Sequence, residues 1–448
     1  MEYSALYFIL VPLIITLAVW RMKYAVYILI VLLPLERAFV TRAYGMHIKL
    51  AEWMGLLCVI VFLWNFLIKP RKNIFPAAIY FPLIIFAVIN IVFSLAALPD
   101  VIKFGSSLDF NSPGFRSIKV TMWCVSSILL SMAVAYSIKD KRDLENCITV
   151  LLGSTLILCA VSLTALLAEI LGMHFARWAL ISRPVFIGIK ATFSEPAYFA
   201  HYMSLILPLA VMVFVLKTYR LGTAFTIAAS FVLFLANYFS FSTTGLIGMT
   251  AMLFLIPYFT HHYHLTGIEK KMRYFLTIVL CAYLVFLIGF LFNINFIKVT
   301  MGNYFEKLYI SEGRFAGRAM AFKMFLDSPL IGFGPGNWAW YAEQGYMAGV
   351  TREIFIRPSY NCLYWEIMVD LGIAGLIPFV WFFINLFRQL SKAVWAAKDL
   401  FLQAVLIGFI AGFILLLVEY YICFNFYRVY VWVFVGMAAA AIRLARES

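Results

Sequence analysis

Long apolar segments recur along almost the whole chain, and short polar connections separate each segment from the next. A helix needs about 20 apolar residues to cross the hydrocarbon core of a bilayer. On that criterion the pattern predicts membrane-spanning helices at roughly 4–20, 24–40, 51–68, 75–97, 118–137, 145–170, 196–216, 221–240, 243–260, 274–293, 362–387, 399–419 and 427–444. Pro34, Glu36 and Arg37 cut the second segment short, so the alternative to about 13 spans is about 12, with one early segment re-entrant.

Composition agrees with this pattern. The 448 residues are 65% hydrophobic and 12% charged, whereas a soluble domain is about 45–50% apolar and about 25% charged. The sequence therefore predicts an all-α, polytopic integral membrane protein. Its net charge of +14 does not require nucleic acid as a partner, because most Lys and Arg fall in short loops, where topology and anionic membrane lipids explain them.

The basic residues of the short loops predict the orientation. They form seven clusters at alternate connections, which we assign to the cytoplasm. The clusters are Arg21 and Lys23; Lys69, Arg71 and Lys72; Lys139, Lys141 and Arg142; Lys217 and Arg220; Lys270, Lys271 and Arg273; Arg388, Lys392 and Lys398; Arg443 and Arg446. This places the longer connections 98–117, 171–195 and 293–361 outside. We expect one transmembrane domain over 1–448, with 293–361 as its large outer loop.

The large loop carries the densest candidate chemistry. Arg314 and Arg318 are four residues apart, so on a helix they share one face. Phe315, Ala319, Phe322 and Leu326 supply the apolar stripe of that helix. Pro329 and the glycines after it end the helix in a tight turn that exposes backbone groups. Two guanidiniums beside such a turn suit phosphate or pyrophosphate. The alternative is a solvated helix face that carries two arginines.

A second group of ionisable residues precedes the span at 196–216. Glu195 and His201 stand at its start, with Arg183 and Lys190 before them. An ionisable group at the membrane is a functional hypothesis, here a general base or a ligand for a sugar hydroxyl. The alternative for Glu195 is a helix-start residue before Pro196, and the alternative for His201 is a buried, satisfied histidine.

The large loop ends in Arg357, Tyr360 and Asn361, which lead into the next span. Polar groups there suit a site at the membrane surface, although a tyrosine at this depth is also typical of the interfacial aromatic belt. His261, His262 and His264 resemble a metal cluster, but we interpret them as a solvated loop. The seven cysteines form no close CxxC pair, so the sequence predicts no metal site and no disulfide framework.

The order of these motifs resembles the bacterial O-antigen polymerase and O-antigen ligase superfamily. The resemblance rests on Ser311-x-x-Arg314, on Pro329-x-x-Gly-x-Gly-x-Gly336, on Asn361 and on Gly372-x-x-Gly375. The earlier Phe193-Ser-Glu-Pro-Ala-Tyr-Phe-Ala200 is similar to a motif of the exopolysaccharide polymerases in that superfamily.

The resemblance implies a GT-C-like, inverting glycosyltransferase that needs no metal and no cofactor. It would act at the periplasmic face of the bacterial inner membrane. Its donor would be a glycan on undecaprenyl pyrophosphate, its acceptor a second glycan, and a polysaccharide chain-length regulator a partner. The essential loop arginine of the family corresponds to Arg314. Ligases of the family usually have His-Asn where this chain has Tyr360-Asn361, which favours a polymerase.

These residues suggest a mechanism. Arg314 and Arg318, with Arg183 or Lys190, would hold the pyrophosphate and stabilise the charge that grows on it. Glu195 is the candidate base, with Tyr360 and His201 as weaker ones, while Arg357 and Asn361 contact the glycan. A transporter or flippase of lipid-linked sugars is the other class of function, but the chain shows no internal repeat of the kind such proteins often carry.

Overall fold

The structure is a computed structural model. It describes residues 21–36, 40–43, 46–68, 74–96, 113–183, 186–215, 223–263, 317–341, 362–421 and 426–447. In this part of the chain, eight helices are long and apolar enough to cross a membrane. The expected class, an all-α polytopic membrane protein, is therefore confirmed.

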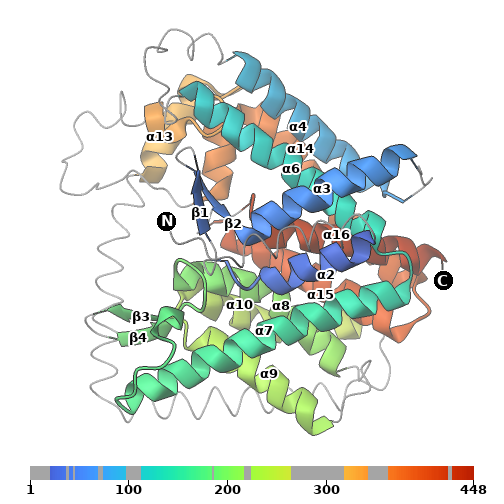
Figure 1. Cartoon of the computed structure of the whole chain (residues 1–448). Helices are drawn as coiled ribbons and strands as arrows, with labels where there is room; N and C mark the ends of the chain where they lie inside the picture. The colour runs from blue at the N-terminus through green and yellow to red at the C-terminus, as the bar shows by residue number, and fades with distance from the viewer. Residues whose placement is uncertain are drawn as a thin grey trace.

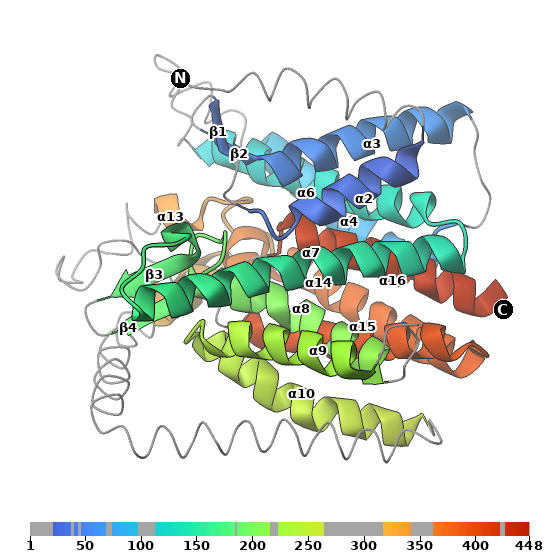
Figure 2. The ribbon, with the colours of Figure 1, turned by 60° about the horizontal axis from the view of Figure 1, so that its bottom comes forward.

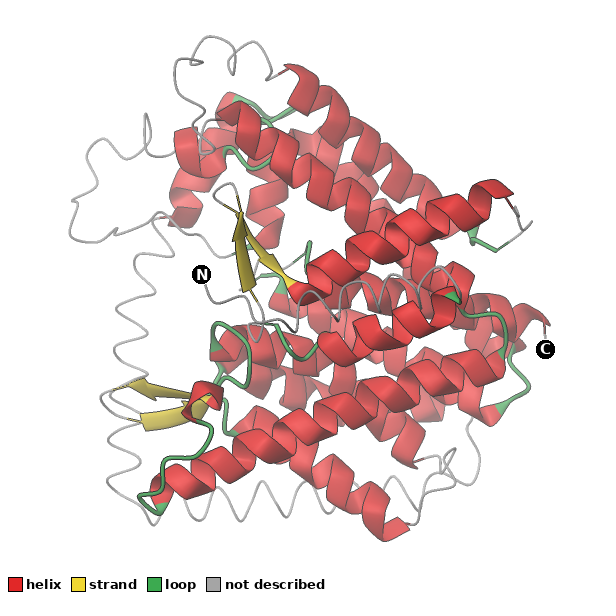
Figure 3. Ribbon diagram, in the orientation of Figure 1, coloured by secondary structure: helices red, strands yellow, loops and turns green. Residues whose placement is uncertain are grey.

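The helices follow the expected order (Figures 1 and 3). They are α2 (Met22–Leu32), α3 (Leu50–Ile68), α4 (Ala77–Ala96), α6 (Pro113–Ser137), α7 (Lys141–Ile170), α8 (Pro196–Val215), α9 (Thr223–Tyr238), α10 (Thr243–His262), the short α13 (Trp338–Tyr341), α14 (Leu363–Ala396), α15 (Leu400–Glu419) and α16 (Val429–Glu447). A further helix covers 317–327. The expected spans 4–20 and 274–293 lie outside the described residues.

Two antiparallel hairpins were not expected from the sequence. Strand β1 (Val40–Ala43) pairs with β2 (Met46–Lys49), and β3 (Leu180–Arg183) pairs with β4 (Phe186–Ile189). The span expected at 24–40 is wrong in its second half, because α2 ends at Leu32 and Val40 already belongs to β1. Four-residue strands give little period-2 signal, so neither hairpin stands out in an apolar sequence.

Several polar contacts gather the loops of one end of the molecule, which we call the basic end. Lys23 Nζ lies 3.4 Å from Asp143 Oδ1, and Lys141 Nζ lies 2.7 Å from Asp399 Oδ2. The guanidinium of Arg443 donates to the carbonyl oxygen of Ile138, and that of Arg446 donates to Gln389. These contacts connect four of the seven basic clusters, so their predicted placement at one end is confirmed. The other three clusters lie outside the described residues.

The opposite end carries both hairpins, α13 and the turn at 328–338, and we call it the hairpin end. Figures 1 and 2 show these elements on the left, with the C-terminus on the right. Helices α8, α15 and α16 form the centre, because 78–89% of each apolar window is buried, against 39% for α3 and α4. Gly408 of α15 allows α8 to approach closely, since a Cβ there would lie 2.8 Å from Leu209 Cα.

Candidate functional site

Three charged side chains from distant parts of the sequence meet at the hairpin end. Glu36 follows α2, Lys49 ends β2, and Arg428 immediately precedes α16. The Lys49 ammonium and the Arg428 guanidinium both donate to the same oxygen, Oε1, of Glu36. All three side chains are largely buried, with exposed fractions of 17%, 23% and 7% for Lys49, Arg428 and Glu36. We call this group the Glu36 cluster.

The Glu36 cluster holds two cations away from water, beside the carboxylates of Glu36 and Glu52. Burial lowers the pKa of the Lys49 ammonium below its ordinary value; Glu36 opposes that shift and Arg428 adds to it. Burial also disfavours the charged form of Arg428, but Glu36, Tyr430 and Tyr198 outweigh it, so the pKa of the guanidinium is raised. Removing charges from water is costly unless they are paired. The two cations are therefore paired with Glu36 and also lie near the carboxylate of Glu52.

The start of α8 lies against this cluster. The Arg428 guanidinium stacks over the Tyr198 ring, 4.6 Å from its centroid. Glu195 directly precedes α8, and its carbonyl oxygen accepts the N–H groups of Tyr198 and Phe199 at 3.1 and 3.3 Å. This is the helix-start geometry expected of a residue before Pro196. The Glu195 side chain is exposed and forms no hydrogen bond or ion pair in the described part of the chain, so both interpretations of Glu195 stay open.

His201 is fully buried one and a half turns into α8. Its Nδ1 lies 2.7 Å from the Tyr430 hydroxyl, and among the described residues its Nε2 has no hydrogen-bond partner. One turn further, the Ser204 hydroxyl donates to Oε1 of Glu419, whose Oε2 is likewise buried without a described partner. His201 thus has the environment of a buried histidine, and its contact with a glycan stays a prediction.

Arg318 binds the end of α15. Its guanidinium donates to the Tyr421 hydroxyl at 3.0 Å and to the Tyr421 carbonyl oxygen at 3.1 Å, and it lies 4.3 Å from the centroid of that ring. The ring of the preceding residue, Tyr420, lies 5.6 Å from the ring of His201. The large loop is therefore connected to α8 through the end of α15, which places Arg318 and His201 in one region.

The remaining predicted site residues are less constrained. Lys190 follows β4, and its N–H donates to the Ala179 carbonyl oxygen at 2.9 Å. The backbone of Arg183 ends β3, but its side chain lies outside what the structure describes. Arg314, Arg357, Tyr360 and Asn361 also lie outside the described residues. Their roles stay predictions.

The glycine turn has a different role from the one its composition suggested. The N–H groups of Gly336 and Trp338 donate to the two carboxylate oxygens of Asp370 at 2.7 and 2.9 Å. Asp370 is buried in α14, where Gly372 interrupts the helix with a φ of 62°. These backbone donors are thus already occupied by a carboxylate of the same chain, so the turn is a docking element for the large loop.

In the helix before the turn, two residues of the predicted apolar stripe are exposed rather than buried. Phe322 and Leu326 are exposed by 50% and 57%, whereas Ala321 and Met324 form the buried face. Phe322 still contacts Trp365, with ring centroids 6.0 Å apart. In a membrane protein an apolar face is stable against lipid, so apolar character does not by itself indicate burial.

Five ionisable residues of this end were not predicted from the sequence as site residues: Glu36, Lys49, Arg428, Asp370 and Glu419. Each is an ionisable residue within or directly beside an apolar helix, which is a functional signal in its own right. Together the hairpin end offers buried cations, one exposed carboxylate at a helix start and surrounding aromatic rings. Such an arrangement can bind an anionic group beside a potential proton acceptor. A comparison of the chain with protein-family models and with curated proteins found no match.

Proposed function

We propose that the protein is a membrane-embedded, inverting glycosyltransferase that polymerises oligosaccharide repeat units carried on undecaprenyl pyrophosphate. One observation supports this most directly. Lys49 and Arg428 meet at Glu36 beside the start of α8, where the Glu195 carboxylate is exposed, and Arg318 binds Tyr421 at the end of α15. A lipid-linked pyrophosphate needs such an end: the lipid stays among helices while the phosphates meet cations.

In the proposed reaction, Arg314 and Arg318 bind the donor pyrophosphate, and Lys49 and Arg428 add positive potential beside it. Glu195 accepts the proton of the acceptor hydroxyl as this oxygen attacks the anomeric carbon from the face opposite the pyrophosphate. The bond from the anomeric carbon to the pyrophosphate oxygen breaks, and the electron pair remains on the pyrophosphate. Fixed guanidiniums stabilise that growing charge more than they stabilise the ground state.

The proposed function places the hairpin end at the periplasmic side of the bacterial inner membrane and the basic end in the cytoplasm. This orientation follows from the excess of Lys and Arg in the loops of the basic end. A polysaccharide chain-length regulator is the partner we expect in the membrane. The acceptor is a second lipid-linked repeat unit.

The test uses purified protein with an undecaprenyl-pyrophosphate-linked repeat unit as the sole glycan substrate, in EDTA, with products separated by mass spectrometry. We expect a ladder of longer lipid-linked products. Arg314→Ala and Glu195→Gln should abolish it. Glu169→Gln is the matched control, because Glu169 is another carboxylate of the hairpin end whose two oxygens are already bound by Arg177 at 2.9 and 2.7 Å.

Each other outcome points to a different function. Transfer that occurs only when a lipid A–core acceptor is added would make the protein an O-antigen ligase. If the unmodified protein forms no product with either acceptor, flipping of the lipid-linked sugar becomes the function to test. An undiminished ladder from Arg314→Ala would contradict the proposed pyrophosphate site.

A further inference from the structure

The helix at 317–327 in the large loop has three different faces. One face is buried in the protein, one is apolar and exposed, and one is polar and exposed. In that order, the faces consist of Gly317, Ala321 and Met324; of Ala319, Phe322 and Leu326; and of Lys323 and Asp327. The members of each face lie within about 60° of one another on an α-helix. Such a helix fits the boundary at which protein, hydrocarbon and water meet.

The exposed apolar face continues into the glycine turn and onto α14. Leu330 and Ile331 of the turn are exposed by 67% and 58%, and Ile373 and Ile377 of α14 by 38% and 60%. The N–H of Ala374 donates to the Leu330 carbonyl oxygen at 3.1 Å, which places the turn at the level of these α14 residues. The turn and the lipid-facing side of α14 therefore form one apolar surface.

The level of the turn along α14 gives its depth. Arg388 is exposed and is the first basic residue of α14 toward the basic end, so it marks where the helix leaves the hydrocarbon core. Fifteen residue steps separate Arg388 from Ile373, which is about 22 Å at 1.5 Å per residue. In a core of about 30 Å, Ile373 and the neighbouring Leu330 therefore lie about 8 Å inside the other boundary. Interfacial helices bury their apolar face to a similar depth, about 5–10 Å.

Irregular backbone at this depth needs hydrogen-bond partners within the protein. Gly372 interrupts α14, which separates two N–H groups from the two carbonyl oxygens that they would bond in an unbroken helix. The glycine turn bonds all four of these groups. The bonds run from Ile373 N–H to the Pro329 oxygen, from Ala374 N–H to the Leu330 oxygen, from Phe333 N–H to the Val369 oxygen and from Gly334 N–H to the Asp370 oxygen, at 2.8–3.1 Å. The interrupted helix and the turn thus satisfy each other without water.

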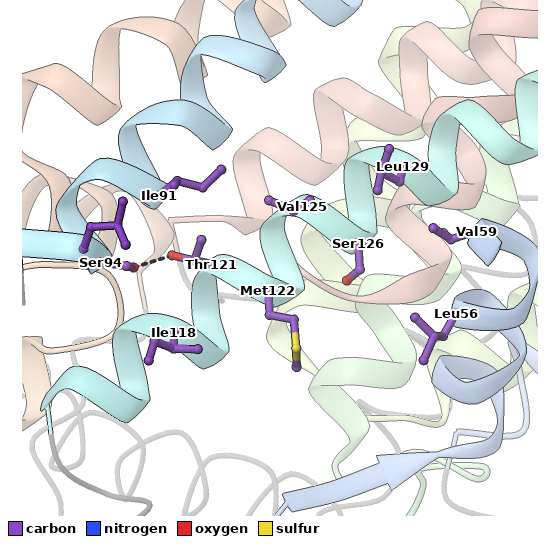
Figure 4. Close-up of a pocket in the computed structure, with 11 residues that line it drawn as sticks. Leu56, Val59, Ile91, Ser94, Ile118, Thr121, Met122, Val125, Ser126 and Leu129 are labelled. Atoms are coloured by element: carbon purple, nitrogen blue, oxygen red, sulfur yellow. Dashed lines mark hydrogen bonds between the residues drawn. The ribbon is translucent and has the colours of Figure 1, made fainter. Parts of the chain in front are cut away.

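The groove between α3, α4 and α6 shows the same arrangement on another apolar surface of the bundle (Figure 4). Met122 of α6 lines this groove and is exposed by 52%. Two hydroxyls of the groove, those of Ser94 and Thr121, hydrogen-bond to each other at 2.6 Å. Apolar side chains that point outward, with polar groups bonded inside, are what a surface in hydrocarbon requires. Met122 is therefore a suitable reference position for contact with lipid.

We propose that the segment 322–331 of the large loop enters the leaflet at the hairpin end. Phe322, Leu326, Leu330 and Ile331 contact lipid acyl chains, and the polar face of the helix faces water. Continuity with the lipid-facing side of α14 selects hydrocarbon as the occupant of this surface. The inference does not depend on glycan transfer. It implies that the large loop does not lie wholly outside the membrane, and that Arg318, one turn before Phe322, is held at the membrane surface.

The test uses the full-length protein in liposomes that contain a phosphatidylcholine with a photoreactive diazirine on one acyl chain. After illumination, mass spectrometry identifies the residues that carry lipid adducts. We expect adducts within 322–331 as well as at Met122. In Leu326→Glu, the adducts at Leu330 and Ile331 should fall about tenfold, because a carboxylate at this depth disfavours insertion. Adducts at Met122 should stay unchanged, which shows that the bundle is intact.

Lys323→Glu is the matched control. It introduces the same side chain on the same helix, but on the polar face, so the adducts at Leu330 and Ile331 should equal those of the unmodified protein. The proposal is wrong if Met122 carries adducts while 322–331 carries none, or if Leu326→Glu leaves the adducts unchanged. A segment free of adducts in a protein that is a dimer in native mass spectrometry would instead assign this surface to contact between two copies of the chain.

Discussion

The ion pairs of Lys141 at the basic end and the Glu36 cluster at the hairpin end differ in burial. At the basic end, Lys141 pairs with Asp399 and Glu145, and the side chains of Lys141 and Asp399 are exposed by 44% and 35%. At the hairpin end, two cations share one oxygen of Glu36, which is 7% exposed. Exposed pairs contribute little to stability because water screens them. Buried charges are costly to leave without partners, so their arrangement indicates a local requirement for charge.

The backbone differs between the two ends as well. The contacts of the basic end involve mainly side chains on helix ends and short loops. At the hairpin end, loop backbone packs into an interrupted helix: the N–H of Phe333 donates to the Val369 carbonyl oxygen and that of Gly334 to the Asp370 carbonyl oxygen, at 2.9 and 2.8 Å. The hairpin end is thus an assembled region whose parts depend on one another, and substitutions there should have the larger effects.

Gly372→Ala should have the largest effect. Gly372 has a φ of 62°, and a Cβ would lie 2.5 Å from the carbonyl carbon and oxygen of Leu330. We expect a loss of at least about 3 kcal/mol in the free energy of unfolding, since a non-glycine residue in this conformation costs about 1–3 kcal/mol before any clash. This loss can be measured by unfolding both proteins in mixed SDS micelles.

Gly153→Ala is the control for that substitution. A Cβ at Gly153, in the middle of α7, meets no atom within 4 Å. Alanine favours helix by about 1 kcal/mol over glycine, so this variant should be as stable as the unmodified protein or slightly more stable. Similar stability of the two variants would mean that the close approach of the large loop to α14 is not required.

Glu36→Gln should cause the second-largest loss in the free energy of unfolding. It removes the charge shared by Lys49 and Arg428 while keeping the size of the side chain, and leaving buried charges uncompensated costs about 3–5 kcal/mol. The same unfolding measurement should show a loss near the lower value, because the glutamine oxygen can still accept one hydrogen bond. Lys49→Met in the Glu36→Gln background should restore part of the loss. A loss below about 1 kcal/mol in Glu36→Gln would make this cluster no different from the pairs of the basic end.

Asp370→Asn should have an intermediate effect. One amide oxygen then replaces two carboxylate oxygens that accept the N–H groups of Gly336 and Trp338. Hydrogen bonds to charged groups contribute about 1.5–3 kcal/mol, so we expect a loss of about 2 kcal/mol. Limited proteolysis should also cleave the 328–341 segment faster than in the unmodified protein. An unchanged cleavage rate would argue against Asp370 as the residue that docks the turn.

Lys141→Gln should have the smallest effect. Its ammonium pairs with Asp399 and, at 3.6 Å, with Glu145, in an exposed position. We expect a loss below about 1 kcal/mol. The loss should disappear at about 1 M salt, where the screening length is about 3 Å. A larger, salt-independent loss would remove the distinction between the two ends.

The hydrophobic pattern alone predicted most of the described long helices, because the bilayer imposes one dominant rule. Every backbone group in hydrocarbon must be hydrogen-bonded within the chain, so a long apolar segment becomes a helix. The expected spans 51–68, 75–97 and 399–419 coincide closely with α3, α4 and α15. The same rule gives no information about the short strands, which lie beyond the apolar segments.

The sequence also determined which loops share an end, because basic residues mark alternate connections, and contacts such as Lys141 with Asp399 agree with that assignment. It placed Glu195 at the start of a helix, from the following proline, as the alternative to a catalytic role. Only the tertiary structure decided that Glu36, Lys49 and Arg428, up to 392 positions apart, meet at one oxygen, and that the glycine turn binds Asp370. Periodicity and charge are local properties of the chain, whereas the meeting of these groups depends on how helices far apart in sequence pack together.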